Sequence, residues 1–213
     1  MTKSKEENLN TCIPSSSFTT HFGLPEEWYH GNLPHRSRNN LIQFVTFRLD
    51  DSLPLEVQNE MEKELKTLSV TKREVEKRKR YEEWLDKGLG CCALANPEMA
   101  QIVFETLNYY DKDRYHLLAW SIMPNHVHVL IETKSDLSKV VKAWKSYTGK
   151  WAFANNQKHR LGIAENAKRF WMAEHWDRFI RNYGHFENTL KYILENPKNA
   201  NLQKSSAAYK FTG

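Results

Sequence analysis

Residues 123–131, with the sequence MPNHVHVLI, constrain the fold of this chain more than any other stretch. Pro124 and Asn125 form a turn dipeptide, and the residues after them alternate polar with apolar, mostly β-branched side chains, a pattern that predicts a strand. Successive side chains of a strand point to opposite faces, so His126 and His128 share one face and stand about 7 Å apart along the strand. Two imidazoles at this separation can converge on one metal ion.

The His-x-His spacing is a weak motif when it is considered alone. Nine histidines among 213 residues produce it by chance about 0.4 times, so the spacing by itself does not distinguish a metal site from coincidence. The other motifs of the chain therefore decide what weight the pair has.

The composition fits one globular domain with a basic surface. A hydrophobic content of 40% is ordinary for a globular protein, and the longest apolar run is too short to cross a membrane. The first residues lack the apolar segment of a signal peptide, and three cysteines do not make a disulfide framework, so we expect a cytoplasmic protein. The net charge of +5 permits a polyanionic partner without requiring one.

The periodicity of the chain predicts one α+β domain with an antiparallel sheet and helices mainly on one side. Residues 41–49 are expected to form a strand, residues 115–123 and 126–132 a hairpin, and residues 170–176 a further strand or edge segment. Helices are expected to begin near 54, 71, 96 and 136, and a last helix from about 185 to 196 should end at Pro197.

The chain divides into a folded part and two tails. Residues 1–27 are polar and predict a flexible tail, residues 28–202 a single domain, and residues 203–213 a C-terminal tail. The charged helical segment 54–95 is expected to be an insertion within the domain. Its run 72–80 holds six basic residues, for which a solvated helix face is favoured and phosphate binding is the alternative.

Basic residues on two predicted elements are candidates for binding a phosphate backbone. In the helix after the histidine strand, Lys139, Lys142 and Lys150 fall mostly on a face away from the apolar stripe, and Lys145 lies at the border. Arg48 lies on the more polar face of the 41–49 strand, where a solvated charge at the strand end is the favoured interpretation.

The last predicted helix places one tyrosine away from its apolar stripe. At about 100° per residue, Tyr192 lies roughly 120° from the centre of the stripe, and Asn196 lies one turn later on the same face. This tyrosine is therefore not placed like a core residue. Tyr147, in the helix after the histidine strand, is the one rival among the nine tyrosines.

Several sequence blocks together resemble the REP-associated tyrosine transposases, which are relatives of the single-tyrosine insertion-sequence transposases and members of the HUH endonuclease group. The resemblance covers about residues 28–202. It is carried, in the order of the family, by residues 29–35 (YHGNLPH), 44–49 (FVTFRL) with 51–54 (DSLP), 123–130 (MPNHVHVL), 144–148 (WKSYT), 177–181 (DRFIR), and Tyr192-Ile193 with Asn196-Pro197. The 54–95 segment is longer than in compact relatives, and residues 1–27 have no counterpart.

The resemblance implies a ferredoxin-like sheet on which His126 and His128 bind a divalent cation, Mg²⁺ or Mn²⁺, with Asn196 completing the metal ligands. It implies that Tyr192 is the nucleophile in cleavage and rejoining of single-stranded or hairpin (REP-like) DNA, through a 5′-phosphotyrosine intermediate. Such a protein would act at the bacterial nucleoid. We expect a monomer, although compact insertion-sequence relatives are dimers that share their sites.

The predicted DNA-binding residues are basic, and exposed bases could stack on Trp28 or Tyr29. The basic residues are His35, Arg36, Arg48, Lys139, Lys142, Lys145 and Lys150. Two other functions remain open from the sequence. One is a hairpin-DNA-binding protein of the same descent that does no chemistry, and the other is an unrelated metal-dependent hydrolase with water as its nucleophile.

Overall fold

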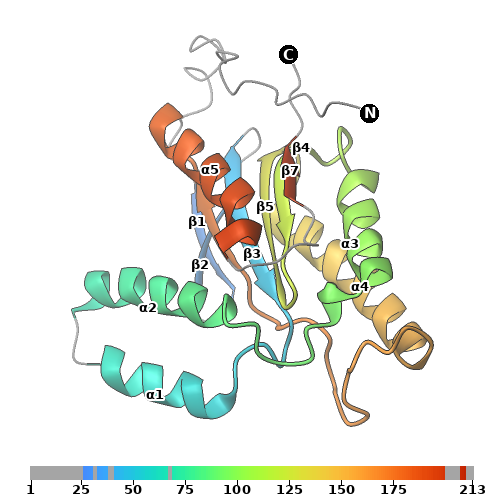
Figure 1. The fold of residues 1–213 in the computed structure, drawn as a ribbon. Helices are drawn as coiled ribbons and strands as arrows, with labels where there is room; N and C mark the ends of the chain where they lie inside the picture. The colour runs from blue at the N-terminus through green and yellow to red at the C-terminus, as the bar shows by residue number, and fades with distance from the viewer. Residues whose placement is uncertain (1–25, 31–32, 38–40, 67–68, 200–206, 210–213) are drawn as a thin grey trace, which may run out of the picture.

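The computed structural model describes residues 26–30, 33–37, 41–66, 69–199 and 207–209 (Figure 1). The elements in chain order are β1 (Glu26–His30), β2 (Leu33–Ser37), β3 (Ile42–Arg48), α1 (Leu55–Leu65), α2 (Val70–Leu85), the 3-10 turn η2 (Ala93–Ala95), α3 (Pro97–Tyr109), β4 (Tyr115–Ile122), β5 (His126–Thr133), α4 (Leu137–His159), β6 (Trp176–Phe179), α5 (Tyr183–Asn199) and β7 (Ala207–Tyr209).

A five-stranded antiparallel sheet forms the centre of the fold, in the order β6-β3-β5-β4-β7. The predicted turn at Pro124-Asn125 joins β4 and β5 as a hairpin, and β5 is the central strand. In the register with β3, His128 lies opposite Thr46 and His126 lies opposite Arg48. The strands β1 and β2 form a separate two-stranded hairpin.

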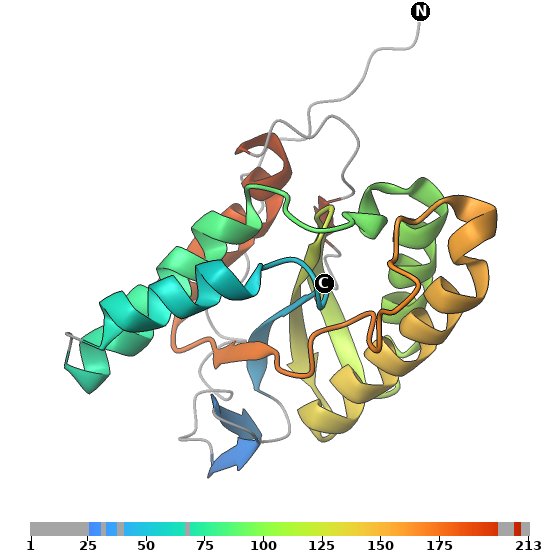
Figure 2. The same ribbon diagram turned by 90° about the horizontal axis from the view of Figure 1, so that it is seen from below.

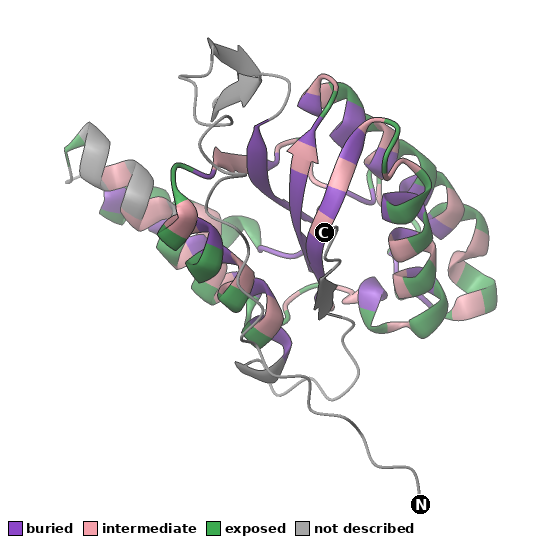
Figure 3. Cartoon of the chain, turned by 90° about the horizontal axis from the view of Figure 1, so that it is seen from above, coloured by how far each residue is buried: buried purple, intermediate pink, exposed green. Residues whose placement is uncertain are grey.

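The alternation of side chains along β5 gives the sheet two different faces. Val127, Val129 and Ile131 belong to a large apolar cluster with residues of α3 and α4, whereas Leu130 belongs to a second cluster with residues of α5. Figure 2 shows α3 and α4 on one side of the sheet and α5 on the other, and Figure 3 shows the buried strands between these helical layers. The predicted antiparallel α+β architecture is confirmed, but the prediction that the helices lie mainly on one side of the sheet is wrong, since α3 and α4 cover one face and α5 covers the other.

Local capping signals in the sequence define where two helices begin. The side chain of Asn96 accepts hydrogen bonds from the backbone N–H groups of Glu98 and Met99, and Pro97 occupies the first turn of α3. The side chain of Asp136 accepts from Ser138 and Lys139 at the start of α4. Both helix starts agree with the sequence prediction.

The charged insertion forms the helix pair α1 and α2, which lies on the same side of the sheet as α5 (Figures 1 and 2). Its buried residues Met61 and Tyr81 pack with Leu53 in a small apolar cluster. The Tyr81 ring contacts the Trp176 ring edge-on, with a centroid distance of 4.7 Å. The insertion is thereby attached to strand β6.

Three predicted elements differ in the structure. The strand lies at Trp176–Phe179 rather than at 170–176, because Phe170 and Trp171 are both buried in the same cluster and do not alternate between two faces. Pro197 lies inside α5 instead of ending it, since a single missing donor does not prevent two further helical residues. Residues 207–209, predicted to be tail, form β7 beside β4.

The N-terminal tail prediction falls mostly outside the described residues, except that residues 26–27 belong to β1. None of the helices in the described part of the chain has the length and apolar character needed to span a membrane.

Candidate active site

The two histidines of β5 lie together in the interior, on the sheet face that α5 covers. His126 is 1% exposed and His128 is 0% exposed, and their Nε2 atoms are 3.0 Å apart. The pair is placed there by the strand period, because Val127 and Val129 pack into the cluster on the opposite face. The sequence prediction that both imidazoles share one face of a strand is confirmed.

A chain of hydrogen bonds defines the tautomer of His126. The side-chain Nδ2 of Asn125 donates to the carbonyl oxygen of Leu89 at 3.1 Å, so the Asn125 Oδ1 atom faces the histidine. This oxygen lies 2.8 Å from Nδ1 of His126 and can only accept, so Nδ1 carries the proton. The Nε2 atom of neutral His126 therefore presents a lone pair.

His128 is positioned by the neighbouring strand. Its Nδ1 atom is 2.8 Å from Oγ1 of Thr46, the residue directly opposite in β3. Its ring stacks on Phe44 with a centroid distance of 5.4 Å. Contacts on both sides of the imidazole thus hold it with Nε2 directed toward His126.

Burial keeps both histidines neutral at physiological pH. It lowers the pKa of His126 to about 3. It also lowers the pKa of His128 well below its ordinary value, and repulsion from a protonated His126 and from Arg178 lowers that pKa further. Neutral imidazole is the form that binds metal ions.

The neutral histidines predict acid sensitivity of the metal-free protein. Below about pH 6.5 the unfolded chain binds protons that the folded histidines do not, so the free energy of unfolding should fall by up to about 1.4 kcal/mol per pH unit for each histidine. Urea titrations with chelator, between about pH 7 and pH 4, would measure this slope. His126→Gln should make it shallower, and an unchanged slope in this variant would contradict the assignment of the neutral state.

Tyr192 of α5 faces the histidine pair. Its hydroxyl oxygen is 3.4 Å from Nε2 of His128, and the two rings meet edge-on with a centroid distance of 5.2 Å. Burial raises the pKa of Tyr192, and the carboxylates of Glu82 and Asp86 raise it further, whereas Arg178 opposes them. The phenol is therefore protonated in the absence of a cation.

Asn196 lies one turn after Tyr192 but not on an exposed helix face. Only 2% of the residue is exposed, its buried Nδ2 atom has no hydrogen-bond partner within the described structure, and its side chain opposes the rise in the pKa of Tyr192. The sequence placed both residues off the apolar stripe, which is correct for the helix alone. The sheet covers that face in the folded protein.

The two imidazoles fit the ligand set of a divalent cation. Donor atoms bound to one ion at about 2.1 Å are about 3.0 Å apart when they stand at right angles, which matches the separation of the two Nε2 atoms. Within the described ranges, no group of three or more His, Cys, Asp or Glu residues closes around one point. One carboxylate lies near the pair: the Oδ1 atom of Asp86 is 4.0 Å from Nε2 of His126.

Sequence reasoning missed two carboxylates at the end of the insertion, Glu82 in α2 and Asp86 directly after it, since the predicted solvated face covered only residues 72–80. Glu82 and Asp86 are four residues apart, so they share one helix face, and this spacing was the one signal available. It did not reveal that the face turns toward the histidines.

Tyr147 does not share the site with the histidines. It is 57% exposed on α4, and the buried residues of α4 pack on the sheet face opposite to His126 and His128. Of the two tyrosines considered, the structure brings only Tyr192 to the histidine pair.

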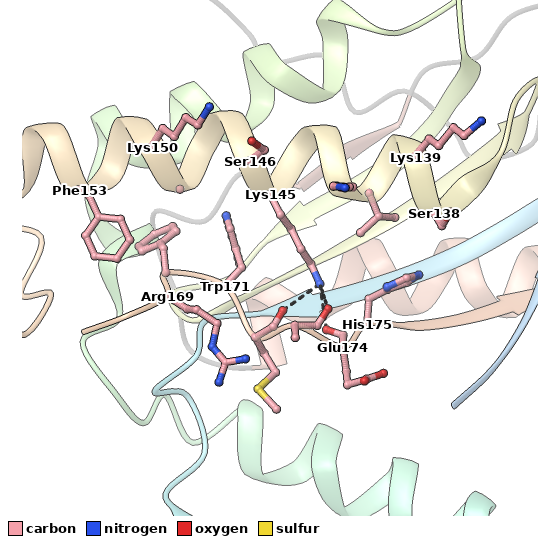
Figure 4. A pocket seen from close by; sticks show the side chains of 16 residues that line it. Ser138, Lys139, Lys145, Ser146, Lys150, Phe153, Arg169, Trp171, Glu174 and His175 are labelled. Atoms are coloured by element: carbon pink, nitrogen blue, oxygen red, sulfur yellow. Dashed lines mark hydrogen bonds between the residues drawn. The ribbon is translucent and has the colours of Figure 1, made fainter. Parts of the chain in front are cut away.

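The predicted basic residues of α4 lie beside a groove between this helix and residues 169–175. Lys139, Lys142 and Lys150 are exposed. Lys145 differs, because its Nζ atom donates to the carbonyl oxygens of residues 172, 173 and 174, and burial lowers its pKa to about 7. Figure 4 shows Lys145 directed to that segment, while Lys139 and Lys150 point away from it.

Arg48 is not the solvated charge that the sequence favoured. It is 4% exposed, it donates a hydrogen bond to Ser52 at 3.0 Å, and its guanidinium lies 5.8 Å from the Tyr81 ring centroid. The α1–α2 insertion covers this end of β3, which the strand pattern could not indicate. The side chains of His35 and Arg36 in β2, and those of Trp28 and Tyr29 in β1, lie outside the part of the structure that is described.

Three comparisons place the chain among known proteins. A solved structure of a REP-associated tyrosine transposase bound to a REP hairpin is similar over 81% of this chain and 76% of that chain, with 15% sequence identity and a TM-score of 0.47. No curated protein matches the chain. Residues 95–196, which contain both histidines, Tyr192 and Asn196, match the family described as "Transposase IS200 like", so this part of the chain is similar to that family of transposases.

Proposed function

We propose that the protein is a metal-dependent enzyme that cuts and rejoins single-stranded or hairpin DNA, with Tyr192 as its nucleophile. The observation that carries the proposal is the approach of the Tyr192 hydroxyl to 3.4 Å from Nε2 of His128, beside a second imidazole nitrogen. The match of residues 95–196 to the IS200-like transposases supports DNA as the substrate. A protein that only binds hairpins has no need of a tyrosine at a histidine pair.

The proposed chemistry is a transesterification. The Tyr192 oxygen attacks phosphorus, a new tyrosine O–P bond forms, the P–O3′ bond breaks, and the 3′ oxygen leaves as a hydroxyl after taking a proton. The product is a 5′-phosphotyrosine that a 3′-hydroxyl can attack in the reverse direction, so the strand can be rejoined. No water is consumed, which distinguishes this reaction from hydrolysis.

His126 and His128 would hold Mg²⁺ or Mn²⁺, and two nitrogen ligands favour Mn²⁺. When bound, the ion supplies positive charge that polarises the scissile phosphate and stabilises a phenolate. This charge is needed because burial and two carboxylates raise the pKa of Tyr192. Asn196 is a proposed further ligand, through its carbonyl oxygen, since it lies one turn from Tyr192.

All residues of the proposed active site come from one chain. His126, His128 and Tyr192 come from β5 and α5 of the same molecule, and these elements pack on each other in the apolar cluster that contains Leu130 and Ile193. We therefore propose that a monomer is sufficient for cleavage, acting on DNA in the cytoplasm at the nucleoid.

The direct test uses the full chain with single-stranded oligonucleotides from the flanks of its own gene and Mn²⁺. A covalent protein–DNA complex that survives denaturant is expected, with the phosphate on a tyrosine. Binding without any cleavage would favour the hairpin-binding alternative. Cleavage without a covalent complex would favour a hydrolase.

The exposed lysines of α4 are the proposed contact with the DNA backbone. The REP-associated transposase in the similar structure binds a REP hairpin, and we propose a hairpin or single strand as the partner here. Lys139, Lys142 and Lys150 are exposed along one helix, so they can contact successive phosphates of a DNA backbone. Lys145 and Arg48 are less suited, because hydrogen bonds within the protein already use their donors.

Charge reversal at two of these lysines should weaken DNA binding. In the double variant Lys142→Glu and Lys150→Glu, the slope of log affinity against log salt should become shallower by about 0.7 to 0.9 for each phosphate that the variant no longer neutralises. Fluorescence anisotropy between about 50 and 200 mM salt would measure it. Lys158→Glu, on the same helix but outside the groove, is the control. Equal slopes in all three proteins would rule out this face of α4.

A further inference from the structure

A carboxylate from the helical insertion reaches the histidine pair. Asp86 follows the last residue of α2, and its Oδ1 atom lies 4.0 Å from Nε2 of His126. The Asp86 side chain is 40% exposed, so it lies at the boundary between the buried histidines and solvent. The insertion that carries it is separated from β5 by about 40 residues of sequence.

The two facing atoms cannot form a hydrogen bond with each other in their resting states. The proton of His126 is on Nδ1, where it is donated to Asn125, so Nε2 offers a lone pair. The ionised carboxylate of Asp86 also only accepts. A third donor atom, Nε2 of His128, is 3.0 Å from Nε2 of His126. The Thr46 hydroxyl can donate to or accept from Nδ1 of His128, so Nε2 of His128 either donates to His126 or, with the proton on Nδ1, offers a second lone pair. In the second tautomer a cation would be stabilised by both imidazoles and by the Asp86 carboxylate beside His126.

The position of Asp86 is determined by packing of the segment that follows it. Asn125 donates to the carbonyl oxygen of Leu89, and the N–H of Leu94 donates to the carbonyl oxygen of Pro124. Both bonds tie residues 89–94 to the turn that precedes β5. Gly90 adopts a φ of +87°, and an added Cβ would lie 2.6 Å from the Asp51 carbonyl oxygen, so only glycine allows this close approach.

We propose that Asp86 is the third protein ligand of the divalent cation held by His126 and His128, an inference that rests on the proposed function. Two donors of one ion at about 2.1 Å can be up to about 4.2 Å apart, so the observed 3.0 and 4.0 Å both suit a shared ion. A set of two imidazoles and one carboxylate leaves positions open for Asn196 and for a phosphate oxygen.

If Asp86 is a metal ligand, the α1–α2 insertion contributes directly to the active site. Glu82, one turn before Asp86, lines a small cavity with Thr46 and Arg178, on the same side of the sheet as Tyr192. The C-terminal half of α2 is therefore part of the active-site wall rather than a solvated appendage. Metal affinity depends on the insertion being docked on the sheet.

The test is Mn²⁺ binding by the full chain without DNA, measured by electron paramagnetic resonance of free Mn²⁺. Asp86→Asn keeps the size and capping position but removes the charge, and should weaken binding about tenfold or more. The matched control is Glu83→Gln, an exposed neighbour that pairs with Lys79 at 3.9 Å. It should bind like the wild type, and His126→Ala should lose binding.

Thermal melting separates a ligand from a structural residue. Asp86→Asn should melt like the wild type in chelator and should lose only the increase in Tm that Mn²⁺ produces. An equal fall with and without Mn²⁺ would overturn the proposal. Wild-type affinity in Asp86→Asn, with binding lost in His126→Ala, would overturn the role of Asp86 and leave the proposed function intact. Unchanged binding in His126→Ala would overturn the metal centre and the role of Asp86 together.

Discussion

Tyr192→Phe is expected to abolish DNA cleavage and the covalent complex while leaving the protein folded and able to bind DNA and Mn²⁺. Phenylalanine has no oxygen to attack phosphorus, so no slower route through this residue remains. The hydroxyl lies 3.4 Å from His128, a long hydrogen bond, and also interacts with the Asn196 side chain, so its loss should change the free energy of unfolding by about 1 kcal/mol. Denaturing gels with labelled oligonucleotide would measure the adduct.

Tyr147→Phe is the matched control for this experiment, since it removes the same hydroxyl from an exposed tyrosine on the other side of the sheet. It should cleave like the wild type. Sequencing of the DNA-linked peptide after wild-type cleavage should identify Tyr192. A linkage at Tyr147, or full activity in Tyr192→Phe, would show that the nucleophile is assigned wrongly.

His128→Ala is expected to abolish cleavage and Mn²⁺ binding, and chelator should have the same effect on the wild type. The imidazole is fully buried and contacts Phe44, Thr46 and Tyr192, so the variant also creates a cavity. A cost of about 1 to 3 kcal/mol in the free energy of unfolding is expected from that cavity. Activity should vanish although most of the protein remains folded.

The control for the second experiment is His116→Gln, a substitution on strand β4 at a position paired with Glu132, far along the hairpin from His126. It should retain cleavage and Mn²⁺ affinity. DNA affinity should survive in His128→Ala, because the proposed contact surface is on α4. Cleavage by the wild type in excess chelator would show that no metal ion is required.

The strand period alone was sufficient to place the core of the candidate site. Because neighbouring side chains of a strand alternate, the pattern of residues 126–131 required that both histidines share one face and the valines the other, and the structure agrees. The caps of α3 and α4 were equally predictable, since a side chain at the cap bonds to backbone two or three residues away. The sequence resemblance agrees with the match of residues 95–196 to the IS200-like transposases.

Residues that depend on distant segments could not be assigned from local patterns. The burial of Arg48 results from the packing of the insertion, and the inward orientation of Lys145 results from three carbonyl groups about 28 residues later in the chain. A helical wheel shows which side of a helix is polar. It does not show whether solvent, DNA or another part of the protein faces that side.

Asp86 illustrates this division most clearly. The sequence determined that Glu82 and Asp86 share a helix face, that His126 and His128 share a strand face, and that Tyr192 and Asn196 lie off an apolar stripe, because each relation is set by local backbone geometry. Only the tertiary structure decided that these three faces meet. Their meeting depends on the hydrogen bonds that tie residues 89–94 to the β4–β5 turn and on the packing of α5, and such long-range contacts leave no periodic signal in the sequence.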